Sequence, residues 1–119
     1  MQLLLISSRP EVWTACLPVF ADGGCTLRQV PSLEEAKTII RDTPPALALL
    51  DLGLDDKALR QAVIDIMMID ASVHTAVVSD MDPEAFHEAA EGLGILMPLP
   101  SSPRPADAEK LLAALKSLM

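Results

Sequence analysis

The residue best placed for chemistry is Asp51, which ends an apolar run in the stretch ALALLDLGLDD between Ala46 and Asp56. Unbroken apolar residues are typical of a strand buried on both faces, as in a parallel sheet covered by helices. A carboxylate at the carboxyl end of such a strand lies where open α/β folds place their ligand crevice. The first apolar run, LLLISSRP, ends at the same edge but offers the neutral hydroxyls of Ser7 and Ser8. We therefore expect Asp51 to lie beside hydroxyl groups and not beside further acids.

Four other acids fall in loops at the same predicted edge: Asp55, Asp56, Asp80 and Asp82. They could hold a divalent cation together with Asp51, because carboxylates are the hard oxygen ligands that Mg²⁺ prefers. They could instead be helix caps, since Asp56 and Asp82 each precede a helical pattern and a negative charge stabilises a helix N-terminus. Acids in such positions are more often caps, so we expect no cofactor and at most weak binding of Mg²⁺.

Sequence signals of catalysis are missing from the chain. It has no G-x-G-x-x-G or G-x-x-x-x-G-K-[ST] phosphate loop, and no G-x-S-x-G motif surrounds its serines. His74 and His87 have no Cys or Glu at metal-ligand spacing and are interpreted as surface or boundary residues. We therefore expect no catalytic residues, no metal site and no enzymatic activity.

Composition narrows the class of partner. The formal net charge is −8, from 17 acids against nine Lys and Arg, which argues against direct binding to nucleic acid. No apolar run approaches the length of about 20 residues that a membrane helix needs, and no basic region precedes the first apolar segment. Two cysteines, Cys16 and Cys25, do not form a disulfide framework. We expect a cytoplasmic protein with an aliphatic core and no membrane partner.

The elements that would position these residues alternate along the chain. Strands are predicted at residues 3–6, 25–30, 46–50, 73–78 and 95–97. Helices are predicted from Pro10 through Val19, from a Ser32 cap to about 41, from 56 to 69, from 82 to about 91, and from 106 to 118. Strands that alternate with helices at this spacing predict a parallel sheet with helices on both faces. Residues 1–119 are therefore predicted to form one three-layer α/β/α domain.

The order of these motifs resembles the receiver domain of bacterial two-component response regulators, over the whole chain. In that family the first strand runs into an acidic pair and often a proline, and here Ser7-Ser8 and Pro10 stand in those positions. The phosphoacceptor aspartate ends the third strand in a context such as LLDLxL, which LLDLGL matches at Asp51. The fourth strand ends on Thr or Ser, which Ser79 matches. The resemblance implies a flavodoxin-like, CheY-like (βα)5 fold and a place in phosphorelay signal transduction.

Several departures remove the chemistry that this resemblance would imply. Receivers typically close the fifth strand with an aromatic residue, two further residues and Lys-Pro. Counting along GLGILMPLP puts Leu96 at the aromatic position and Leu99 at the lysine, so the charge that would pair with an acyl phosphate is missing. Ser7 and Ser8 would coordinate a cation only weakly. Leu96 cannot repeat the family's switch, in which an aromatic rotates inward as the hydroxyl at the position of Ser79 moves toward the phosphoryl group. These departures predict a degenerate, pseudo-receiver-like domain.

Three functions stay open from the sequence. The first is protein–protein interaction without phosphorylation, through the fourth helix, fifth strand and last helix, the region this family commonly uses. Its partner would be a sensor kinase, a downstream regulator or a second copy of the chain. The alternative is an atypical phosphoacceptor receiver that uses Asp51, with a cation held by Asp55, Asp56 or Asp80. The third, a small enzyme or ligand-binding domain on the same fold, has no motif in its favour.

Overall fold

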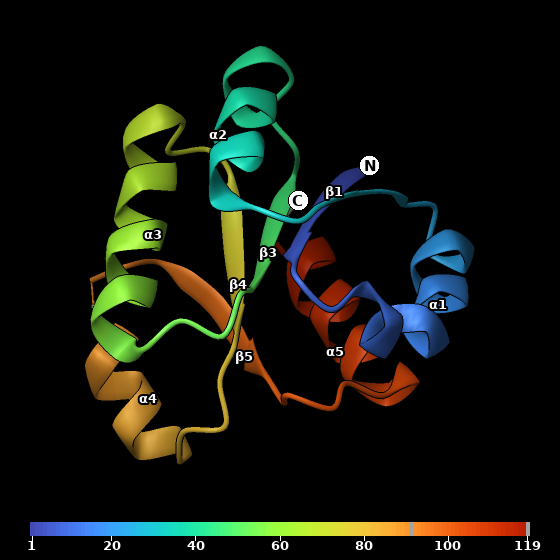
Figure 1. Cartoon of the computed structure of the whole chain (residues 1–119). Coiled ribbons are helices and arrows are strands. Elements are labelled where there is room, and N and C mark those ends of the chain that lie inside the picture. The colour runs from blue at the N-terminus through green and yellow to red at the C-terminus, as the bar shows by residue number, and fades with distance from the viewer. Residues whose placement is uncertain (91, 119) are drawn as a thin grey trace.

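The computed structural model describes every residue except 91 and 119, and its centre is a parallel sheet in the strand order β2-β1-β3-β4-β5 (Figure 1). Because the order places the ends of β1 and β3 side by side, the two segments that carry the predicted site residues are neighbours. The strands are β1 (Gln2–Ser7), β2 (Thr26–Val30), β3 (Leu47–Asp51), β4 (His74–Val78) and β5 (Ile95–Leu99).

Helices cover both faces of the sheet, as predicted. They are the 3₁₀ helix η1 (Pro10–Cys16), α1 (Leu17–Asp22), α2 (Leu33–Asp42), α3 (Asp56–Ile69), α4 (Pro83–Ala90) and α5 (Pro105–Lys116). Successive strand residues point to opposite faces, so Leu3 and Leu5 pack in a cluster with η1, α1 and α5, while Leu4 and Ile6 pack in a second cluster with α2 and α3. Figure 1 shows α1 and α5 on one side of the sheet and α3 and α4 on the other. The three-layer α/β/α, flavodoxin-like fold is therefore confirmed.

The first predicted helix was wrong as a single helix from Pro10 through Val19. The chain instead forms η1 and then begins α1 at Leu17, with Pro18 in its first turn. Proline has no N–H to donate to the carbonyl four residues earlier, but it is well tolerated in the first turn of a helix. Pro18 therefore belongs to the start of α1 and does not interrupt a longer helix.

Helix caps agree only in part with the predictions. Ser32 caps α2 as predicted, and its Oγ accepts a hydrogen bond from the backbone N–H of Glu35 at 3.3 Å. At α3 the cap is Asp55, whose Oδ1 accepts from the N–H of Ala58 at 2.8 Å, so the assignment of Asp56 as a cap was wrong. Asp82 Oδ2 accepts from the N–H of Ala85 at 3.4 Å before α4. Two of the acids at this edge are therefore engaged in starting helices.

Strand β5 is longer than the predicted 95–97 and includes Pro98. A proline is tolerated there because β5 is an edge strand, and the pairing with β4 shifts register between Thr75 and Val77. The predicted end of the fourth helix at Glu91 lies outside the described residues. The last helix ends at Lys116 and not at 118. Among the residues described here, no helix is long and apolar enough to cross a membrane.

Candidate functional site

Asp51 and Ser7 are brought together by the pairing of β1 and β3. The parallel register places Ser7 directly opposite Asp51 at the carboxyl ends of the two strands. Both residues are buried, with 1 % of Ser7 and 2 % of Asp51 exposed. The hydroxyl of Ser7 donates a hydrogen bond to Asp51 Oδ2 at 2.9 Å. The predicted proximity of these two residues is therefore present, and it takes the form of a direct hydrogen bond.

Two further side chains close over the same carboxylate. Arg9 Nη2 lies 2.9 Å from Asp51 Oδ1, and Arg9 Nε donates to Oδ1 at 3.0 Å and to Oδ2 at 3.1 Å. The indole Nε1–H of Trp13 donates to Oδ2 at 2.8 Å. Both oxygens of Asp51 are thus engaged by protein donors, and one of these donors carries a full positive charge. We call Ser7, Arg9, Trp13 and Asp51 the Asp51 cluster.

The local path of the chain explains why these donors reach Asp51. The backbone N–H of Arg9 donates to Ser7 Oγ at 3.1 Å, which turns the chain directly after β1. Pro10 then opens η1, and this short helix carries Trp13 into the apolar cluster with no exposed surface. A buried indole N–H needs an acceptor, and the end of β3 supplies one in the Asp51 carboxylate.

Arg9 and Trp13 were missed by the sequence analysis. The available signal for Arg9 was its place two residues after Ser7, at the loop that opens toward the predicted site edge. A positive charge there is the natural complement of a buried carboxylate that lacks a metal-binding acidic pair. The signal for Trp13 was weaker, because its place in a predicted helix did not reveal that the indole N–H faces the sheet.

The arrangement limits what Asp51 can do chemically. Attack on a phosphoryl group needs an accessible oxygen lone pair and a cation that neutralises the developing charge. In the Asp51 cluster the positive charge is already supplied by the guanidinium of Arg9, and the carboxylate is almost fully buried. Ser7 and Trp13 offer Mg²⁺ a neutral hydroxyl and an N–H, not carboxylate oxygens. The residues that surround Asp51 therefore do not fit a divalent cation.

The loop acids lie apart from one another in the part of the chain that the structure describes. Among the residues that the structure describes, no three His, Cys, Asp or Glu side chains gather closely enough to hold a metal. Asp80 Oδ1 accepts a hydrogen bond from the backbone N–H of Ser101 at 3.0 Å and so joins two neighbouring loops. Hydrogen bonding by Ser101, with a smaller contribution from the positive charge of Arg9, lowers the pKa of Asp80. Asp80 is therefore a structural acid at the edge of the Asp51 cluster.

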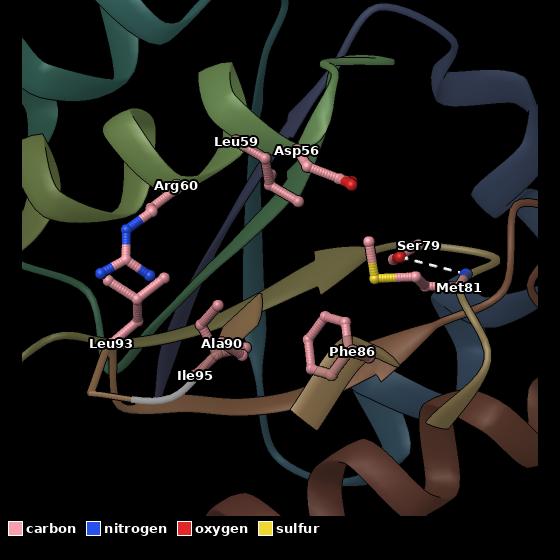
Figure 2. Close-up of a pocket in the computed structure, with 9 residues that line it drawn as sticks. All are labelled: Asp56, Leu59, Arg60, Ser79, Met81, Phe86, Ala90, Leu93 and Ile95. Carbon is pink, nitrogen blue, oxygen red and sulfur yellow. Dashed lines mark hydrogen bonds between the residues drawn. The ribbon is translucent and has the colours of Figure 1, made fainter. Parts of the chain in front are cut away.

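The remaining predicted site residues lie in different surroundings. Ser79 is half-buried and shares a hollow with Arg9 and Asp51, and its Oγ accepts from the N–H of Met81 at 3.2 Å (Figure 2). Ser8 is exposed, and Leu96 is half-buried on β5.

Leu99, at the position of the family's lysine, is 1 % exposed and packs in the apolar cluster with α5. It does not line the hollow at Asp51 and adds nothing to an exposed apolar patch.

Comparisons by sequence find no relative, since no family model matches the chain and no curated protein matches it with significance. Comparisons of structure find close similarities. A two-component response regulator from Clostridium difficile superposes with a TM-score of 0.76 at 17% identity, over 99% of this chain and 94% of that one. An orphan response regulator of H. pylori gives a TM-score of 0.75 at 19% identity, over 98% and 94% of the two chains.

Proteins with other descriptions share the same architecture. The pilus assembly protein CpaE from Caulobacter crescentus superposes with a TM-score of 0.73 at 18% identity, over 99% of this chain and 98% of that one. At identities this low, the similarity establishes the fold and leaves function to be argued from the site.

Proposed function

We propose that this chain, which has the CheY-like fold of response regulator receiver domains, is a signalling module that binds a partner protein without being phosphorylated. The observation that carries this proposal is the Asp51 cluster. Both oxygens of the residue at the phosphoacceptor position accept hydrogen bonds from Ser7, Arg9 and Trp13. Fold similarity to response regulators supports a role in two-component signalling.

Phosphorylation of Asp51 would compete with the interactions that its carboxylate already makes with Ser7, Arg9 and Trp13. A phosphoryl donor would have to displace the guanidinium of Arg9 and expose a buried carboxylate before any bond to phosphorus forms. Opening a buried ion pair costs several kcal/mol, because the charges lose each other before they regain water. Transfer would also proceed without a bound metal to neutralise the phosphoryl oxygens. Asp51 is therefore assigned a structural role, and no enzymatic activity is proposed for the chain.

The surface proposed for docking is the side of the domain formed by α4, β5 and α5. A hollow there is lined by residues of α4 and β5, among them Phe86, Ile95, Leu96 and Met97, which are all half-buried. Pro98 removes one backbone N–H donor from this edge strand, which disfavours the addition of a further strand. Contact with a partner would therefore use side chains of this face in place of strand pairing.

The test is an NMR titration of the ¹⁵N-labelled chain with Mg²⁺ and then with beryllofluoride, a mimic of the acyl phosphate. We expect no saturable shifts at Ser7, Arg9, Trp13 or Asp51, and no labelling of Asp51 by acetyl phosphate in mass spectrometry. The Asp51→Asn variant is the control for non-specific ion effects. Saturable shifts centred on Asp51 that disappear in the variant would establish the alternative, an atypical phosphoacceptor receiver that uses Mg²⁺.

A further inference from the structure

The 3₁₀ helix η1 is longer than such helices usually are. It runs for 7 residues, whereas runs beyond three or four residues are uncommon because the hydrogen bonds of a 3₁₀ helix have poorer geometry than those of an α-helix. The apolar residues do not require this form. Trp13, Cys16 and Phe20 are all buried and stand at i, i+3 and i+7, the spacing of one face of an α-helix. Another feature of the chain must therefore favour the 3₁₀ form.

Pro18 prevents an α-helix from running through η1 into α1. In a continuous α-helix over residues 10–22, the carbonyl of Thr14 would accept a hydrogen bond from the N–H of residue 18. Proline has no N–H, and its ring would clash with that carbonyl. In the structure the carbonyl of Thr14 accepts instead from the N–H of Leu17, its 3₁₀ partner three residues later. The observed path therefore satisfies the carbonyl that Pro18 would leave unpaired in an α-helix.

The two helical forms would place Trp13 differently. A 3₁₀ helix advances about 2.0 Å and turns about 120° per residue, against about 1.5 Å and about 100° in an α-helix. Relative to Cys16, an α-helical Trp13 would be turned by about 60° and drawn about 1.5 Å along the axis. The indole Nε1 lies 2.8 Å from Asp51 Oδ2, so a displacement of this size would take it beyond hydrogen-bond distance. The geometry of η1 therefore decides whether the indole contacts the carboxylate.

We propose that Pro18 is a positioning residue for the Asp51 cluster: by excluding a continuous α-helix over residues 10–22, it keeps the indole of Trp13 on the carboxylate. The side chain of Pro18 is exposed, and its effect is exerted through the backbone of η1. This inference rests on the proposed function, in which a closed Asp51 cluster takes the place of phosphorylation, and adds the residue that keeps the cluster closed. An α-helical form of residues 10–22 would be the open form of the site.

The experiment compares Pro18→Ala with the wild-type chain by NMR. Contacts between the Hα of one residue and the N–H four residues later are characteristic of an α-helix, and contacts two residues later of a 3₁₀ helix. We expect Pro18→Ala to show the α-helical contacts across Thr14. We also expect its Trp13 indole proton to exchange with solvent about tenfold faster or more, relative to the backbone amides of β3. Exchange of the indole proton at the wild-type rate would overturn the proposal.

Pro10→Ala is the matched control for this variant. Pro10 is also an exposed proline in a first helical turn, but it stands at the start of η1, where no intrahelical N–H donor is needed. We expect Pro10→Ala to keep the 3₁₀ contacts of η1 and the wild-type exchange rate of the indole proton. Equal acceleration by Pro10→Ala and Pro18→Ala would mean that any lost proline loosens the segment, and the proposal would fail.

Trp13→Phe decides which of the two features holds the other in place. This variant removes the indole N–H and leaves Pro18 unchanged, so we expect η1 to keep its 3₁₀ contacts. A change to α-helical contacts in Trp13→Phe would show that the bond to Asp51 holds η1 in its form, and would overturn the role of Pro18. Because this variant carries no substitution at Pro18, it tests the proposal even if Pro18→Ala does not fold.

Unfolding in urea gives a readout that a proline with a merely structural role would not change. Trp13→Phe should raise the equilibrium constant of unfolding roughly tenfold in the wild-type background, but little in the Pro18→Ala background, where the indole bond is already lost. Equal effects in both backgrounds would show that Pro18 and the indole bond are independent, against the proposal.

The outcomes also separate this inference from the function on which it rests. A wild-type exchange rate in Pro18→Ala, with wild-type Asp51 still silent toward Mg²⁺ and beryllofluoride, would remove the role of Pro18 and leave the phosphorylation-independent module standing. Saturable binding of beryllofluoride at Asp51 of the wild-type chain would remove the proposed function whatever Pro18 does.

Discussion

Trp13 and Asp51 are joined by a buried hydrogen bond of 2.8 Å that ties η1 to the end of β3. The bond links one face of the sheet to its carboxyl edge, because the indole ring packs in the cluster with α1 and α5 while its N–H reaches the carboxylate. It also places the chain's one tryptophan directly against the Asp51 carboxylate. The indole is therefore an intrinsic reporter of what happens at Asp51.

Replacing Asp51 by Asn is expected to destabilise the fold. The substitution keeps the size of the side chain but removes the charge that pairs with Arg9 and one acceptor oxygen. Breaking a fully buried pair costs about 3–5 kcal/mol. Because the side chain of Arg9 is 34% exposed and can regain water, we expect a smaller loss of about 2–3 kcal/mol in the free energy of unfolding. Urea denaturation measures it, with Asp42→Asn as the exposed control, and equal stability of both variants would contradict a structural role.

Replacing Trp13 by Phe tests the indole hydrogen bond separately. Phe keeps most of the buried apolar surface but leaves Asp51 Oδ2 without one of its donors, which should cost about 1–3 kcal/mol. Combining Trp13→Phe with Asp51→Asn forms a double-mutant cycle, and we expect a coupling energy of at least about 0.5 kcal/mol. Additive losses would show that the two side chains are independent, against the contact described above. Circular dichroism follows unfolding of all four proteins, since two of them lack the tryptophan.

Removing Arg9 should open the site to a cation. In the double variant Ser8→Asp/Arg9→Ala the guanidinium is gone and a second carboxylate stands after β1. Two carboxylates with water are a common ligand set for Mg²⁺. We expect Mg²⁺ to change the fluorescence of Trp13 saturably in this variant and to leave the wild-type signal unchanged. Ser8→Asp alone is the matched control, and a response from that single variant would mean that Arg9 does not block the site.

Asp80 should show an acid transition shifted to low pH. Its pKa is lowered chiefly by hydrogen bonding from Ser101, so the folded protein binds this proton less readily than the unfolded chain. The contribution of Asp80 to stability is therefore complete well above the ordinary Asp value of about 3.9 and is lost as the pH falls through the lower folded pKa. Carboxyl ¹³C NMR measures the titration, and the amide of Ser101 should follow the same curve. In Asp80→Asn that amide transition should vanish, and an ordinary pKa for Asp80 would contradict the loop contact.

The fold could be predicted from the sequence because the local patterns of its segments agreed with one another. Apolar runs of strand length, the Ser32 cap and the alternation with helical patterns predicted the three layers, and the run before Asp51 placed this residue at the end of β3. The errors arose where a local rule was ambiguous. Pro18 is compatible with either end of a helix, and the structure places it in the first turn of α1. Asp55 and Asp56 are adjacent acids that can both cap a helix, and the structure shows that Asp55 is the cap of α3.

For the candidate site, the sequence predicted which strand ends lie together but not which side chains contact Asp51. The alternation of strands and helices predicts that Ser7 and Asp51 lie at one edge of the sheet, and the pairing of β1 with β3 that joins them is that of the CheY-like fold that the resemblance implies. The donors from Arg9 and Trp13 depend on the path of η1, and the sequence pattern indicated an ordinary helix there. Leu99 illustrates the same limit, since the predicted strand ended at residue 97, and both its place on β5 and its burial against α5 depend on the packing of side chains.

The ion pair between Arg9 and Asp51 means that the counter-charge is part of the polypeptide. A dissolved ion occupies a site according to its concentration, but a tethered side chain has a high local concentration that no cellular supply alters. The internal state of this domain would then be fixed when the chain folds. Occupancy of a partner by such a domain follows mass action, set by copy number and affinity, so synthesis and degradation become the means of turning its signal up or down.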